Sequence, residues 1–145
     1  MKYHHPLLSW ICRLILAFFF IWAAWAKIAH PGAFARDMMA YQFFPRPLVP
    51  WLALWVPWLE ALAALGLLIP PLFRGARLWI TTLMIAFISL LTLTWLRGLN
   101  ISCGCFGGGH ESVPQALFRD MLLLVPLLVL WLERTPKKPL PEPLS

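Results

Sequence analysis

The residues of this chain best suited to chemistry are two cysteines one glycine apart, Cys103 and Cys105, in the polar segment from Asn100 to Glu111. Gly107 to Gly109 follow, and a glycine-rich backbone adopts positive φ values, so the two sulfurs can turn towards each other. A disulfide between cysteines this close closes a very small ring and departs from relaxed geometry. Such a bridge is comparatively easy to reduce, so the pattern predicts an exchangeable, redox-active disulfide.

Two other interpretations of this segment stay open. A static disulfide in so small a ring would restrict little of the unfolded chain and would add little stability. A metal site is the other, since Cys103, Cys105 and His110 supply a Cys-x-Cys-x4-His set that suits Zn²⁺ or Cu(I). That spacing matches no standard zinc pattern, so we expect no bound metal.

Composition indicates a membrane protein. The chain has 145 residues, of which 61% are hydrophobic and 12% charged, a balance unlike that of a soluble domain. The net charge of +6 comes from basic residues that stand mostly beside apolar runs, so we read them as topology signals for a lipid bilayer and expect no nucleic-acid partner. Cys12 lies inside the first apolar run and is expected to be an inert packing residue.

Apolar runs long enough to cross a bilayer predict an all-α membrane protein with four transmembrane helices in a bundle. The first run is too long for a signal-peptide core, so we expect a retained helix. The runs are Leu7 to Ile28, Leu48 to Leu72, Leu78 to Leu96 and Ala116 to Leu132. The Cys-Gly-Cys loop then lies between the third and fourth helices. Residues 1–132 form one membrane domain, and residues 133–145 are a charged, Pro-rich tail expected to be disordered.

A short helix is predicted between the first two spans. Phe34, Met38, Tyr41 and Phe44 recur at the spacing of one helical face, which favours a helix lying in the membrane interface. An ordinary loop with aromatic anchors is the alternative. Further along, Ser112 and Gln115 have the spacing of a capping box that begins the fourth helix.

The second run carries two residues that do not suit a lipid-facing helix, Pro57 and Glu60. Either one helix runs through Pro57 with a kink, which places Glu60 deep in the membrane, or the helix begins at Pro57, which places Glu60 near the Lys27 end. A buried carboxylate needs a partner. Arg13 is the candidate if Glu60 is deep, and Lys27 or Arg97 if it is shallow.

The distribution of basic residues predicts the topology. Six of those outside the membrane core fall on the side of the two termini and four on the other side. The first group is Lys2, Arg74, Arg77, Arg134, Lys137 and Lys138, and the second is Lys27, Arg36, Arg46 and Arg97. The excess favours cytoplasmic termini in a bacterial inner membrane. The Cys-Gly-Cys loop then faces the periplasm, where disulfides form and are used.

Residues spread over nearly the whole chain resemble those of the MauE family, within the wider group of DoxX-like four-helix membrane proteins. The matching residues are Lys27, His30-Pro31, Phe34-Ala35, Tyr41, Pro45, Pro57-Trp58-Leu59-Glu60, Arg97-Gly98 and Cys103-Gly104-Cys105-Phe106-Gly107. The resemblance implies a membrane component of a thiol–disulfide relay that works beside a thioredoxin-like, MauD-like partner. In the named family that relay supports maturation of the disulfide-rich small subunit of methylamine dehydrogenase.

On this reading Cys103 and Cys105 are the reacting residues, Arg97 holds the thiolate, and Glu60 with Lys27 fixes the helix geometry behind them. Four-helix disulfide oxidases of the DsbB type use two cysteine pairs, and this chain has one pair besides Cys12, so a periplasmic thioredoxin-fold partner is expected to carry the other pair. A quinone is one candidate electron acceptor, but no cofactor is certain. The alternatives are a non-catalytic scaffold subunit and a quinone-linked, DoxX-like oxidoreductase subunit.

Overall fold

The computed structural model describes residues 6–99 and 112–133, and these are predominantly α-helical. Four of the helices are long and apolar enough to cross a membrane, so the chain is a multi-pass membrane protein. The elements are α1 (Pro6–Ala29), α2 (Pro31–Ala40), the 3₁₀ turn η1 (Arg46–Leu48), α3 (Val49–Leu68), the 3₁₀ turn η2 (Pro70–Leu72), α4 (Phe73–Leu96) and α5 (Val113–Leu132). The four spans are α1, α3 with η1, α4 with η2, and α5.

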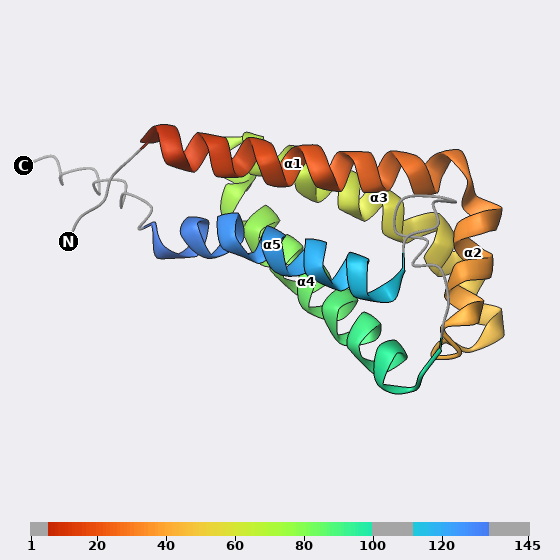
Figure 1. Ribbon diagram of the computed structural model, residues 1–145. Coiled ribbons are helices and arrows are strands. Elements are labelled where there is room, and N and C mark those ends of the chain that lie inside the picture. Colours follow the sequence, from red (N-terminus) through yellow and green to blue (C-terminus); the bar gives the residue numbers. More distant parts are fainter. Residues whose placement is uncertain (1–5, 100–111, 134–145) are drawn as a thin grey trace, which may run out of the picture.

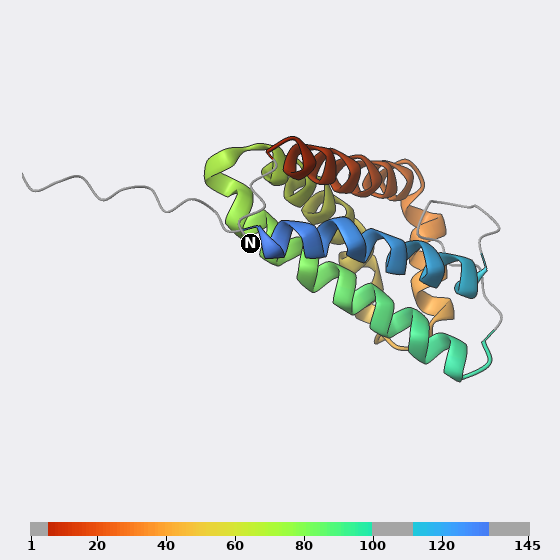
Figure 2. The same cartoon turned by 60° about the vertical axis from the view of Figure 1, so that its left-hand side comes forward.

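The four long helices form a closed bundle (Figures 1 and 2). α1 packs on α3, α3 on α4, α4 on α5, and α5 returns to α1. The start of α1 and the end of α5 lie at one end of the bundle, which we call the terminal end, and α2 crosses the other end (Figure 1). The predicted four-helix bundle is confirmed.

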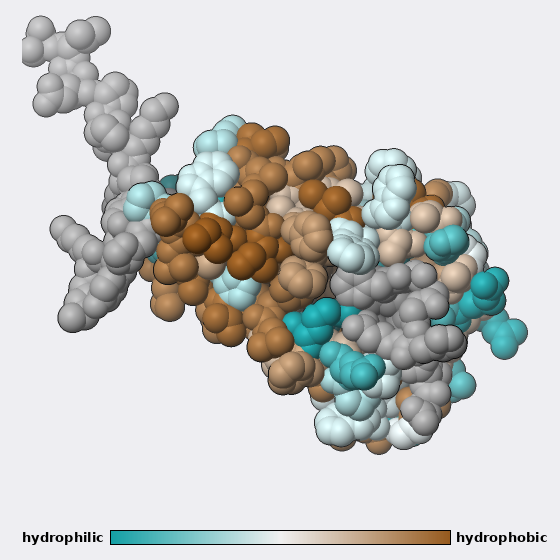
Figure 3. All heavy atoms as spheres, turned by 45° about the horizontal axis from the view of Figure 1, so that its top comes forward, coloured by the Kyte–Doolittle hydropathy of each residue, from teal (hydrophilic) through white to brown (hydrophobic). Residues whose placement is uncertain are grey.

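The bundle is apolar inside and outside. Its core includes Cys12, Leu16, Leu67, Ile80 and Leu130, all buried, so Cys12 is a packing residue as predicted. Large hydrophobic side chains also cover the outside, and Figure 3 shows them as an extended brown face that gives way to paler and teal residues towards the α2 end. An apolar surface of this extent faces lipid in a membrane protein.

The short helix between the first two spans is α2, and its apolar stripe faces the protein. Phe34 and Met38 are buried against Val49 and Ala53 in the first turns of α3. Pro31 stands at the first turn of α2, where its missing N–H leaves no bond unmade. The contacts fix α2 across the end of the bundle, and its place in a membrane interface stays a prediction.

The second span is one helix that runs through Pro57, as the first of the two interpretations held. The third span begins earlier than the predicted Leu78, because α4 already starts at Phe73 and contains Arg74 and Arg77. Pro70 and Pro71 end α3 and form η2. A proline ring is compatible with the first turn of a following helix, so three residues are enough to reverse the chain.

A glycine ends α4 and sets the direction in which the chain leaves it. Gly98 has a φ of +69°, a left-handed conformation that glycine adopts without a Cβ penalty. The amide of Gly98 donates to the carbonyl of Trp95 at 2.9 Å, and the amide of Leu99 to that of Thr94 at 3.3 Å. This is a Schellman motif, which satisfies the last carbonyls of the helix.

The start of α5 is also set locally. The Gln115 side-chain oxygen accepts a hydrogen bond from the Ser112 amide at 3.1 Å, one half of the predicted capping box. The chain therefore leaves the described region after Leu99 and returns at Ser112 at the α2 end of the bundle (Figure 1). The Cys-Gly-Cys loop and residues 134–145 of the expected tail lie outside the described residues.

The packing of α3 on α4 predicts opposite effects for two glycines. A Cβ on Gly66 would lie 2.9 Å from the Cβ of Ala76, whereas a Cβ on Gly75 would meet nothing within 4 Å. Gly66→Ala should lower the free energy of unfolding by about 1–3 kcal/mol through overpacking. Gly75→Ala, the matched control, should leave it unchanged or slightly raised. Thermal unfolding in detergent measures both, and equal effects would contradict a close contact at Gly66.

Candidate functional site

A buried ion pair joins α1 to α3. The Lys27 ammonium lies 2.7 Å from Oε1 of Glu60, and the two side chains are 2% and 1% exposed. Lys27 stands in the last turn of α1 and Glu60 near the middle of α3. The Lys27 ammonium also lies 5.1 Å from the ring centroid of Phe34 and 4.7 Å from that of Phe87, a cation–π arrangement. The pair balances two charges that neither helix could bury alone.

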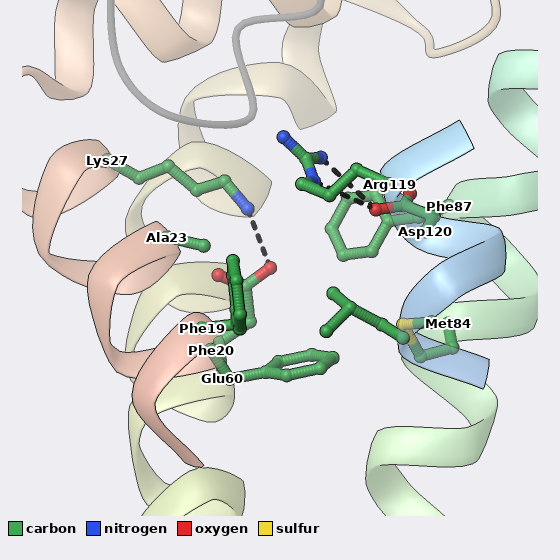
Figure 4. A pocket seen from close by; sticks show the side chains of 10 residues that line it. Phe19, Phe20, Ala23, Lys27, Glu60, Met84, Phe87, Arg119 and Asp120 are labelled. Atoms are coloured by element: carbon green, nitrogen blue, oxygen red, sulfur yellow. Dashed lines mark hydrogen bonds and ion pairs between the residues drawn. The ribbon is translucent and has the colours of Figure 1, made fainter. Parts of the chain in front are cut away.

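A second ion pair faces the first from α5. The Arg119 guanidinium lies 3.1 Å from Oδ1 of Asp120, with side chains 17% and 8% exposed, and Arg119 Nε donates to the same oxygen at 3.3 Å. Figure 4 shows Lys27 and Glu60 on one side of a cavity, and Arg119 and Asp120 on the other. Four charged side chains of three helices thus meet inside the bundle with a formal sum of zero.

The cavity between the two pairs has a volume of about 40 Å³. Its apolar lining comes from Phe19, Phe20, Ala23, Met84, Phe87 and Leu123. Oε2 of Glu60 is buried and has no hydrogen-bond partner among the described residues, and a carboxylate oxygen in that state needs a donor. The volume suits water molecules and is far below the roughly 300 Å³ at which small-molecule pockets begin. The aromatic lining would have to open to admit a quinone ring.

Tyr41 joins this cluster from the chain after α2. It is buried with Leu91 of α4 and with Val113 and Ala116 of α5. Burial raises the pKa of the Tyr41 phenol, the carboxylates of Asp37 and Asp120 raise it further, and Arg119 opposes them. The phenol therefore stays neutral beside the buried charges.

The predicted supporting residues separate into two places. Lys27 and Glu60 meet directly, although Glu60 lies in mid-helix, where Arg13 had been its expected partner. Arg13 instead lies at the terminal end, 3.8 Å from the ring centroid of Phe73. Arg97 lies at the end of α4, with its guanidinium 5.9 Å from the ring centroid of Phe43.

The three residues of the loop site, Cys103, Cys105 and His110, lie outside the described residues. Within residues 6–99 and 112–133, no group of three or more His, Cys, Asp or Glu side chains could hold a metal ion.

The sequence analysis did not predict that Asp120 belongs to the buried cluster of charges. The sequence did contain an indication of this, because Arg119 and Asp120 are adjacent opposite charges inside an apolar run. Charged residues in such a run usually face the bundle interior and pair with one another.

Breaking either half of the Lys27–Glu60 pair should be costly. Lys27→Met or Glu60→Leu should each lower the free energy of unfolding by about 3–5 kcal/mol, because the other charge stays buried without its partner. The double variant should be more stable than either single variant, since two apolar side chains replace the pair. Unfolding in detergent measures this double-mutant cycle, and simple additivity would contradict direct coupling.

The raised pKa of Tyr41 predicts a loss of stability in alkali. The folded phenol keeps its proton to higher pH than the unfolded one, which titrates near about pH 10. The contribution is therefore complete below about pH 10 and is lost as the pH rises above it. Between about pH 9 and about pH 11 the wild type should lose more stability than Tyr41→Phe, as followed by unfolding in detergent. Parallel pH profiles would contradict a desolvated phenol.

A family model described as "Methylamine utilisation protein MauE" matches residues 5–133. No solved structure matches the chain.

Two curated relatives carry the name "Methylamine utilization protein MauE". The one from Paracoccus denitrificans is 33% identical over 108 residues, which cover 74% of this chain and 58% of the relative. The one from Methylorubrum extorquens is 30% identical over 108 residues, again 74% of this chain and 58% of the relative. This chain thus spans little more than half the length of these relatives. The family match covers all four spans and both buried ion pairs, and the chain belongs to the MauE family.

Proposed function

We propose that this protein is the membrane component of a thiol–disulfide relay that serves methylamine utilisation. In this relay the Cys103–Cys105 pair exchanges electrons with a thioredoxin-fold, MauD-like partner. The observation that carries the proposal is the place of the Cys-Gly-Cys segment in the sequence, directly between α4 and α5 of a multi-pass membrane protein of the MauE family. The names of the family and of the relatives supply methylamine utilisation.

The exchange is a balanced two-electron reaction. A thiolate of the partner attacks one sulfur of the Cys103–Cys105 disulfide, which forms a mixed disulfide and releases the other sulfur as a thiolate. The second thiolate of the partner attacks the mixed disulfide and releases the first sulfur. The partner is then oxidised to a disulfide and this chain is reduced to a dithiol, with two protons taken up from water. Because each step is reversible, the reverse sequence oxidises this chain.

Three features of the described residues support chemistry in the segment that joins α4 to α5. Arg97 stands at the end of α4, where its positive charge would favour a nearby thiolate. The first turn of α5 carries the positive end of the helix dipole. Arg119 lies seven residues after Ser112, about 10 Å along the helix. Its charge is already balanced by Asp120, so Arg97 is the stronger candidate.

The buried ion pairs support the proposal as a rigid base. Lys27–Glu60 ties α1 to α3, and Arg119–Asp120 faces that pair from α5. A thiol pair that must meet a protein partner benefits from anchors that do not shift. In the proposed topology both termini are cytoplasmic in the inner membrane, and the segment that carries the thiols is periplasmic.

The test replaces the cysteines and uses Cys12 as the matched control. Cys103→Ser with Cys105→Ser should abolish maturation of the disulfide-rich client and growth on methylamine, whereas Cys12→Ser should leave both unchanged because Cys12 is a buried packing residue. Single Cys103→Ser and Cys105→Ser variants should trap a mixed disulfide with the partner on non-reducing gels. Full maturation with both cysteines replaced would show a scaffold without redox chemistry.

A membrane-impermeant maleimide tests the topology and the lability of the bond in intact cells. Cys103 and Cys105 should be labelled only after mild reduction, and Cys12 should stay unlabelled. Labelling that requires permeabilised cells would overturn the periplasmic placement.

A further inference from the structure

Two arginines at the terminal end of the bundle share one aromatic ring. The guanidinium carbon of Arg13 on α1 lies 3.8 Å from the ring centroid of Phe73, and that of Arg77 on α4 lies 5.4 Å from the same centroid. The ring centroid of Trp10 lies 5.2 Å from the guanidinium carbon of Arg13, and that of Trp131 lies 4.1 Å from the guanidinium carbon of Arg77. Aromatic faces stabilise cations without neutralising them. Two positive charges are therefore held close together by rings contributed by three helices.

Neither charge has an ion-pair partner among the described residues. Among residues 6–99 and 112–133, the salt bridges are Lys27–Glu60 and Arg119–Asp120, and neither involves Arg13 or Arg77. Glu133 attracts Arg13 electrostatically from beyond ion-pair distance. Arg13 and Arg77 are therefore two neighbouring positive charges without an ion-pair partner in residues 6–99 and 112–133.

With the part of the chain that the structure describes, the two guanidinium groups make a single hydrogen bond. Arg77 Nη1 donates to the carbonyl of Leu130 at 2.8 Å, which satisfies an acceptor in the last turn of α5. The Nε atoms of Arg13 and Arg77 are buried without a hydrogen-bond partner among the described residues. A guanidinium group has five N–H donors in a planar fork, and that fork fits the oxygens of a phosphate.

The depth of the two residues matches a lipid headgroup. Arg13 stands seven residues after the start of α1 and Arg77 four residues after the start of α4, which is about 10 Å and about 6 Å from the helix ends. Both side chains are partly exposed, and long basic side chains extend from such positions to the headgroup layer.

We propose that Arg13 and Arg77, held around Phe73, form a binding site for the phosphate of an anionic lipid headgroup at the terminal end of the bundle. The lipid phosphate would supply the missing negative charge and accept from the unused donors. The site is independent of the cysteine pair and of the proposed relay, because it lies at the end of the bundle opposite the Lys27–Glu60 pair.

The test measures which lipids stay bound to the intact 145-residue chain. Wild-type protein released from mixed-lipid nanodiscs should keep more phosphatidylglycerol than phosphatidylcholine bound. Native mass spectrometry of the released protein measures the two bound lipids. Arg13→Gln and Arg77→Gln should each weaken that preference roughly fivefold, the usual effect of one basic residue near a charged membrane surface. Arg36→Gln, an exposed charge on α2, is the matched control and should leave the preference unchanged. An unchanged preference in both test variants would overturn the proposal.

Further measurements separate a lipid from a soluble phosphate and from a purely structural role. Inorganic phosphate at millimolar concentration should neither displace phosphatidylglycerol nor raise the unfolding temperature in phosphatidylcholine, and if it does both, the ligand is a soluble anion instead. Arg13→Lys and Arg77→Lys keep the charge but lose the planar fork, so each should keep part of the preference even if the Gln variants fold poorly. The wild-type preference should fall as salt rises, and a preference insensitive to salt would contradict an ionic site.

Discussion

The Lys27–Glu60 ion pair is the interaction on which the arrangement of the bundle depends. Its two side chains are almost fully buried, so each charge is tolerable only while the other stays in place. Apolar helices in lipid slide and rotate against one another at little cost, since side chains and acyl chains are similarly apolar. A buried ion pair removes that freedom, because any large shift of α1 along α3 would separate the charges.

The pair also explains the shape of the α2 end. Because the last turn of α1 meets the middle of α3, the first turns of α3 extend past α1, and α2 covers them with Phe34 and Met38. Tyr41 then reaches Leu91 and the start of α5. Because α1 and α3 are offset, α2 and Tyr41 pack across the end of the bundle where α4 ends and α5 begins.

Charged side chains are stabilised differently at the two ends of the bundle. At the α2 end, the four buried charges form two ion pairs that face each other across a small cavity, which favours rigidity where α4 ends and α5 begins. At the terminal end, Arg13 and Arg77 are stabilised by aromatic rings and one helix-end carbonyl, and neither has an ion-pair partner among the described residues. The first arrangement suits an internal support and the second suits contact with the surrounding membrane.

The helices of this chain follow from local features of the sequence. Hydrophobic length, prolines, the capping residues at Ser112 and the glycine after Arg97 are properties of contiguous residues, so the four spans, α2 and the start of α5 could be predicted from them. The exception was the start of α4, where Pro70 and Pro71 were compatible with either a turn or a helix start. Membership of the MauE family could also be predicted from the sequence, because it depends on residue identities along nearly the whole chain.

Which charged residues meet depends on the packing of the whole bundle. Arg13, Lys27 and Arg97 were all reasonable partners for Glu60, and nothing local distinguishes them. The pairing depends on the axial offset of α1 against α3 and on the rotation of each helix, where one residue of shift turns a side chain by about 100°. For the same reason, the sequence did not predict that Arg119 and Asp120 lie close to that pair. It also did not predict that Arg13 and Arg77 contact the same ring, Phe73. Such contacts arise from the packing of whole helices, which no single stretch of sequence specifies.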